Sequence, residues 1–161
     1  MSVAIYLNIK GAEGESQAKD FKDEIDVMSF QWGLSQSGTF HTGSGGGAGR
    51  VSMGDLVINK KVDAASPKLM ISCANGKHFA TAILTVCKAG GDSMVKYCVI
   101  TLTDVLISRL DVTGGQGDDT VGENISLNFA KVKFEYSEQS NDGKEKKGPD
   151  FAWDVQKNSK G

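Results

Sequence analysis

The sequence predicts a mainly β fold, a small closed β-barrel with one short helix, and three observations carry that prediction. Apolar and polar residues alternate with a period of two through most of the 161 residues, as they do in strands with one buried face. Twenty glycines supply many turns. Several strand-like runs also change parity midway, which a bulged or sharply bent strand can do and a regular strand cannot. Such bends let a sheet close on itself.

The strand-like runs follow one another along a single predicted domain, residues 1–161. The first run places Val3, Ile5, Leu7 and Ile9 on one face. The polar stretch 137–149 is expected to be a loop, and the tail 157–161 is expected to be frayed. The further runs lie near 25–35, 51–60, 80–88, 94–112, 124–137 and 150–156.

Parity within the run 25–35 predicts two faces. The even positions Met28, Phe30, Trp32 and Leu34 are apolar and are expected to face the core. Ser29, Gln31 and Gly33 then face the other way. The alternative is that each run with a parity change is two strands joined by a short loop. The predicted core residues are Ile5, Leu7, Phe30, Trp32, Leu69, Leu84, Val86, Leu127, Phe129, Phe134 and Trp153.

Residues 66–75 have helical rather than strand-like spacing. Ser66 can serve as the N-cap, Pro67 fits the first helical position, and Gly76 is a C-terminal stop. The helix is expected to lie against the sheet by one apolar face, formed by Leu69, Met70 and Cys73.

Composition excludes several classes of partner. The 18 basic and 20 acidic residues give a net charge of −2, so no basic excess favours nucleic acid or an anionic membrane surface. Near-neutrality permits self-association. No apolar run approaches the roughly 20 residues of a membrane span. Residues 1–10 lack the pattern of a signal peptide, so we expect folding in the cytoplasm and no cleaved leader.

Motifs for catalysis, metals or cofactors are weak. The three cysteines form no CxxC pair and are expected to be free, buried or half-buried thiols. His41 and His78 form no HxH or HxxxH pair. The stretch Gly43–Ala48 matches G-x-G-x-x-A, but a strand-like run follows it where a dinucleotide site needs a helix. Solvated loops are the expected place of the acidic residues Asp118, Asp119 and Glu123. We therefore expect no enzyme, no cofactor and no metal site.

One surface feature favours self-assembly. Phe40 lies at the tip of a glycine-rich loop, and exposed apolar residues on long loops often mark contacts with partners. A β-domain must also protect its sheet edges.

Blocks spread over nearly the whole chain, in order, resemble the Hcp (hemolysin-coregulated) proteins of the bacterial type VI secretion machine. The stretch 14–38 is similar to the family's first loop and second strand, and 41–51 to its extended glycine-rich loop. The sequence ASPKLMISCANGKHF (65–79) resembles the single helix and its exit. Residues 84–91, 123–136 and 152–158 resemble later strands.

The resemblance implies a barrel of two bent antiparallel sheets with the helix on its side. Six copies would form a ring, and rings would stack into a tube inside a contractile sheath, with a VgrG-like spike at the tip. The tube would be secreted and carry small effectors in its lumen as a chaperone. The implied lumen residues are Ser29, Gln31 and Gly33. The candidate ring-stacking loop comprises Ser37, Gly38, Thr39, Phe40, His41, Gly43, Gly45 and Gly49.

Two positions depart from the family pattern. Gln31 stands where relatives often carry serine, which affects the expected cargo, and Cys87 stands where they often carry a basic residue. The alternatives are a phage-tail-tube-like protein, which would share the architecture, and a monomeric β-barrel binding module or enzyme. No extra C-terminal domain of the kind fused to some Hcp proteins is expected.

Overall fold

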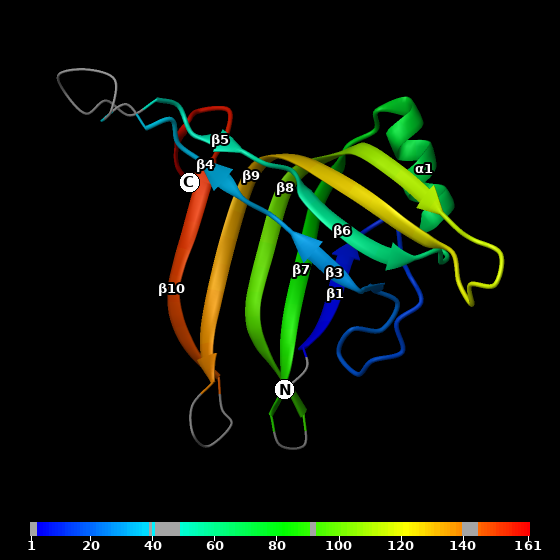
Figure 1. Ribbon diagram of the computed structural model, residues 1–161. Coiled ribbons are helices and arrows are strands. Elements are labelled where there is room, and N and C mark those ends of the chain that lie inside the picture. Colours follow the sequence, from blue (N-terminus) through cyan, green and yellow to red (C-terminus); the bar gives the residue numbers. More distant parts are fainter. Residues whose placement is uncertain (1–2, 39, 41–48, 91–92, 140–144) are drawn as a thin grey trace.

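The protein folds into antiparallel β-sheet with one short helix (Figure 1). The computed structural model describes residues 3–38, 40, 49–90, 93–139 and 145–161. Within these residues, no helix is long and apolar enough to cross a membrane. The elements are β1 (Val3–Ile9), β2 (Ile25–Val27), β3 (Ser29–Gln31), β4 (Leu34–Ser35), β5 (Ser52–Met53), β6 (Leu56–Lys61), α1 (Ser66–Asn75), β7 (Phe79–Gly90), β8 (Ser93–Thr113), β9 (Gly122–Gln139), β10 (Glu145–Asp154) and β11 (Ser159–Lys160).

Strand pairing defines a large sheet with a branch. The main path runs β11-β10-β9-β8-β7-β1-β2, while β6 pairs with β9 and β3 pairs with β6. Only Met28 separates β2 from β3, and its backbone N–H donates to the carbonyl of Asn59 in β6 at 2.8 Å. No ladder between β2 and β6 is assigned among the described strands. The pairing therefore shows bent antiparallel sheets, not by itself the closed barrel that the sequence predicts.

The parity changes have two different structural origins. The run 124–137 is part of the single long strand β9, which pairs with the long strand β8. β8 bends where Asp104 has a left-handed φ of 58° and where its register with β9 shifts between Ile107 and Arg109. The runs 25–35 and 51–60 are instead divided into separate short strands. Both interpretations of parity are therefore correct, each for different runs.

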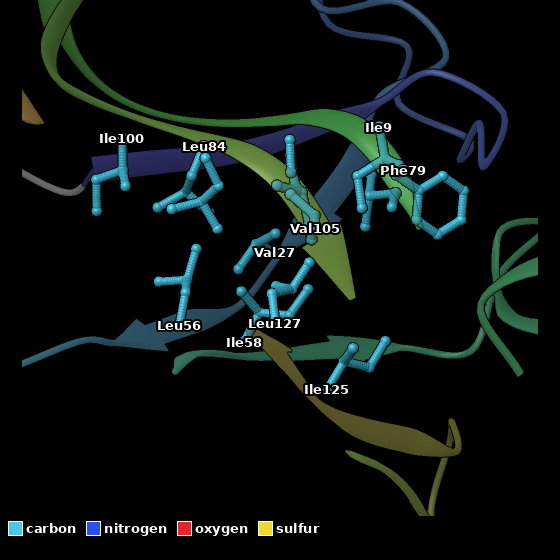
Figure 2. Close-up of a cluster of buried hydrophobic side chains, with 14 of the residues drawn as sticks. Ile9, Val27, Leu56, Ile58, Phe79, Leu84, Ile100, Val105, Ile125 and Leu127 are labelled. Atoms are coloured by element: carbon cyan, nitrogen blue, oxygen red, sulfur yellow. The ribbon is translucent and has the colours of Figure 1, made fainter. Parts of the chain in front are cut away.

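The core lies between the long strands and the β2-β3-β6 side (Figure 2). Leu56, Ile58, Ile125 and Leu127 come from the paired strands β6 and β9, and each has no exposed surface. Burying one such side chain contributes roughly 1.5–3 kcal/mol, so this cluster makes a large contribution to stability. Of the predicted core, the fully or nearly buried members are Ile5, Leu7, Leu69, Leu84, Val86, Leu127 and Phe129, and the half-buried members packed against them are Phe30, Trp32, Phe134 and Trp153.

Two residues of the predicted core face prove exposed. Met28 is 60% exposed and Leu34 is 50% exposed. The prediction was wrong at these positions because 25–35 is not one strand. Met28 is the joint between β2 and β3, and Leu34 belongs to β4, which pairs with β5 in a separate two-stranded sheet. Alternation cannot be extrapolated across such breaks.

The helix α1 occupies the predicted residues but is rotated and capped differently. Its N-cap is Ala65 without a side-chain hydrogen bond, so Ser66 is the first helical residue, and Gly76 ends the helix at a φ of 70°. The buried positions are Ser66, Leu69 and Ser72, whereas Met70 is 38% exposed and Cys73 is half-buried. The predicted docking face was therefore wrong for Met70.

Two predicted irregular segments are largely strand. β9 continues to Gln139 and β10 begins at Glu145, so most of the expected loop 137–149 is a β-ribbon. The expected frayed tail contains β11, in which Ser159 and Lys160 pair with Asp154 and Trp153.

Candidate assembly and lumen surfaces

The outer face of β3, β6 and β9 is largely polar. Antiparallel register aligns Ser29 with Asn59 of β6, and Asn59 with Asn124 of β9. Residues directly opposite one another share a face, and Asn59 Nδ2 donates to Asn124 Oδ1 at 2.9 Å. Two residues further along the strands, the next row on the same face is Gln31, the apolar Val57, and Ser126.

The same face continues toward β8 with one carboxylate in a hydrogen-bonded cluster. Asn128 Nδ2 donates to Asp55 Oδ1 at 2.8 Å, and Ser108 Oγ donates to Asp55 Oδ2 at 2.7 Å. Both oxygens of Asp55 are therefore occupied. We call the surface formed by Ser29, Gln31, Asn59, Asn124 and Ser126 together with this cluster the polar sheet face. Its polar groups are amides and hydroxyls around the one carboxylate of Asp55.

The three predicted lumen residues are all exposed on this side of the molecule. Ser29 and Gln31 lie on β3, and Gly33 follows it. A Cβ added at Gly33 would meet nothing within 4 Å, so packing does not require glycine there. The sequence did not identify Asn59, Asn124 or Asn128, because their place beside β3 depends on long-range strand pairing.

A second feature is the ribbon formed by β4 and β5 with the described residues that adjoin them, on the side of the molecule away from α1 (Figure 1). Its base is held firmly: Leu34 pairs with Met53, the Gly54 N–H donates to the Gly33 carbonyl at 2.9 Å, and Arg50 Nη2 donates to the Val155 carbonyl at 2.8 Å. This ribbon therefore has a fixed direction at its base.

The described part of the predicted stacking loop is exposed. Ser37, Gly38 and Gly49 are exposed, and Phe40 is 80% exposed. A Cβ at Gly49 would lie 2.4 Å from Ser37 Oγ, so the two arms approach closely there. The candidate residues Thr39, His41, Gly43 and Gly45, and most of the segment that matches the dinucleotide motif, lie outside the described residues.

A buried charged cluster, which the sequence did not predict, joins β6, β9 and α1. Lys60 and Glu123 have fully buried side chains and form an ion pair. Lys60 Nζ also donates to Asp63 Oδ1 at 2.7 Å and to Ser66 Oγ at 3.1 Å, and the Ser66 hydroxyl donates to Glu123. The expectation that Glu123 lies in a solvated loop was wrong, because its partner stands 63 residues earlier in the chain. The Ser66 hydroxyl therefore bonds to this cluster and does not cap the N-terminus of the helix.

The histidine and cysteine side chains considered in the sequence form no common site among the described residues. His78 is exposed and its Nδ1 lies 2.8 Å from Asp104. Cys87 and Cys98 are buried and Cys73 is half-buried, as predicted. In the part of the chain that the structure describes, no three histidine, cysteine or acidic residues are grouped to hold a metal ion.

Fold and surface together define a class of protein: an antiparallel β module with a sheet face rich in amides and hydroxyls and an exposed ribbon at β4 and β5. Residues 6–136 match the family model described as "Type VI secretion system effector, Hcp". The chain is 43% identical over 159 residues to "Protein hcp1" of Pseudomonas aeruginosa PAO1, covering 98% of both sequences. The chain therefore belongs to the Hcp family, the tube and effector proteins of the type VI secretion system.

Solved structures of related proteins superpose on nearly the full length of this chain. A structure titled "Structure of a type six secretion system protein" superposes with a TM-score of 0.93 at 29% identity, covering 99% of this chain and 100% of that one. Hcp1 from Salmonella typhimurium gives a TM-score of 0.80 at 34% identity, covering 99% of both chains. The similarity spans the ribbon, the helix and the long strands together.

Proposed function

We propose that this chain is the repeating subunit of a tube in which six copies form a ring and rings stack. The observation that carries the proposal is the match to Hcp proteins over 98% of the chain. Physical features support it. A net charge of −2 leaves little repulsion between copies. A ring arises from a heterologous contact that closes, and a tube arises from an axial contact that does not.

The same proposal includes closure of the sheet into a barrel. β2 pairs with β1, and β3 pairs with β6, so the chain passes from one end of the sheet to the other through Met28 alone. Acting as one broken strand, β2 and β3 close the circuit through β6, β9, β8, β7 and β1. Closure would pair the edges of β1, β2, β3 and β6, through which copies could otherwise aggregate, while β10 and β11 would remain a branch beside β9.

The polar sheet face is proposed as the lining of the ring's lumen, with Ser29, Gln31 and Gly33 toward cargo. These residues are exposed in the protomer. Amide and hydroxyl groups bind a passing protein through exchangeable hydrogen bonds, each worth about 0.5–1.5 kcal/mol net, so they retain small effectors without holding them irreversibly.

The ribbon is proposed as the axial contact between rings, through Ser37, Gly38, Phe40 and Gly49 together with the residues between them. A weak contact repeated six times makes a stable stack through avidity. The further partners of this proposal are a VgrG-like spike at the tip and the subunits of a contractile sheath. Export would follow assembly in the cytoplasm.

Gold labelling tests the lumen assignment. Gln31→Cys coupled to maleimide-gold is expected to place the gold inside the central hole of rings seen by electron microscopy. Gln17→Cys, an exposed glutamine outside the polar sheet face, is the matched control and should not fill the hole. Unsubstituted protein measures background labelling of Cys73. Gold outside the ring at position 31 would contradict the assignment.

Deleting residues 39–45 tests the ribbon. The strands β4 and β5 at its base are kept, so single rings are expected to form and stacks to be lost. Stacks of normal length from this variant would remove the ribbon from the axial contact.

A further inference from the structure

We propose that Phe40 of one copy inserts into a hollow on a copy in the next ring, between Met28 and Val62. This inference rests on the proposed tube and specifies the surface that receives the ribbon. The hollow has a volume of about 460 Å³, which is enough for a phenyl ring. We call it the Met28–Val62 hollow.

The hollow combines exposed apolar side chains with a buried floor. Met28 is 60% exposed and Val62 is 44% exposed, whereas Val27 is buried. The Val62 N–H donates to the Val121 carbonyl at 2.9 Å, which places a further exposed valine, 44% exposed, beside the rim. Exposed apolar groups that border a cavity are typical of contact sites.

Phe40 and the Met28–Val62 hollow cannot contact each other within one chain. β4, after which Phe40 follows, lies with β5 on one side of the molecule, while the end of β6, after which Val62 follows, lies on the opposite side beside α1 (Figure 1). An apolar knob on one surface and a complementary pocket on another make a head-to-tail contact between copies, which propagates as a stack.

Charge favours this hollow. Its rim carries Glu15, Asp26 and Asp63 against the single cation Lys61. No Asp or Glu stands between Asp26 and Asp55 in the sequence, so the ribbon brings no negative charge to this acidic rim. Complementary or neutral charge at a contact permits approach and selects the partner.

A second hollow that borders a strongly exposed apolar side chain is less suitable. It lies at Ile71, which is 60% exposed, and the basic residues that line it are Lys10, Lys68, Lys77 and His78. The ribbon contributes His41 and Arg50, and like charges disfavour that pairing. Ile71 therefore serves as the control position.

Disulfide trapping between two singly substituted chains tests the contact. A chain carrying Phe40→Cys is mixed with one carrying Val62→Cys under mild oxidation. We expect linked dimers at least about tenfold above those from Phe40→Cys mixed with Ile71→Cys, because contact raises the effective concentration of the thiols. Equal linkage in both mixtures, in samples that stack normally, overturns the proposal.

Charge substitutions provide an independent test. Phe40→Asp is expected to leave single rings and abolish stacking, since it faces three carboxylates. Phe40→Lys should retain clearly more stacking, and Ile71→Asp should stack like the unsubstituted protein. Equal loss for Phe40→Asp and Phe40→Lys contradicts the acidic hollow as receptor. If the unsubstituted protein forms no rings, the proposed function itself fails, and sedimentation of that protein alone reveals this.

Discussion

Replacing Lys60 by methionine removes the cation of the buried cluster while keeping most of the side-chain volume. Neither Lys60 nor Glu123 has exposed side-chain surface, and Glu123 Oε2 has no hydrogen-bond partner. Lys60→Met therefore leaves a buried carboxylate supported by Ser66 alone. Breaking a buried pair from one side costs about 3–5 kcal/mol, which for a chain of this size lowers the melting temperature by roughly 10 °C.

Urea unfolding followed by circular dichroism measures this cost at a fixed protein concentration. Lys61→Met is the matched control, because Lys61 is the exposed neighbour, and it should change stability by less than about 0.5 kcal/mol. The double variant Lys60→Met/Glu123→Leu should recover most of the loss, since apolar replacement of both partners is often neutral or stabilising. A loss below about 1 kcal/mol for Lys60→Met would refute the reasoning.

Three further predictions concern packing and pH. Trp32→Ala should lower the free energy of unfolding in urea by about 2–3 kcal/mol, which is less than the loss expected for a fully buried tryptophan because Trp32 is half-buried. The substitution also removes the hydrogen bond from the indole N–H to the Gly54 carbonyl, 3.1 Å long. Unchanged stability would contradict the packing of Trp32. Gly14→Ala should destabilise the protein by about 1–3 kcal/mol, because the added Cβ would lie 2.7 Å from the Glu24 carbonyl oxygen. Gly33→Ala is the control and should be tolerated, since its Cβ would meet nothing within 4 Å. Equal losses of stability in the two variants would refute this contrast. Burial raises the pKa of the Glu24 carboxyl above its ordinary value. The folded state therefore keeps the carboxyl protonated to a higher pH than the unfolded state does. Stability consequently falls as the pH rises from the unfolded-state pKa to the folded-state pKa. Glu24→Gln should remove that fall in melting-temperature scans across pH, and a pH profile parallel to the unsubstituted protein contradicts the assignment.

The sequence predicts the local features of the fold well where one short segment decides them. Period-two alternation locates β1, β7, β8 and β9, and Gly76 marks the end of α1 because it can adopt the left-handed conformation. The buried or half-buried position of the cysteines follows from their number and spacing. These features depend on residues close together in the chain.

Features that depend on pairing between distant strands could not be predicted from the sequence. Alternation predicts Met28 in the core, yet the chain changes partners there, from β1 to β6, and the side chain turns outward. Lys60 and Glu123 each resemble a surface residue until β6 and β9 are paired. The polar sheet face is partly visible as Ser29 and Gln31, but Asn59 and Asn124 join it only through register.

The measurement that tests the central claim most directly is negative-stain electron microscopy of the purified protein, together with its mass by size-exclusion chromatography and light scattering. The account predicts rings of six subunits with a central hole, and stacks of these rings at high concentration. A monomer at every concentration, without rings, would contradict the tube assignment and leave the likeness to Hcp proteins as one of fold and family alone.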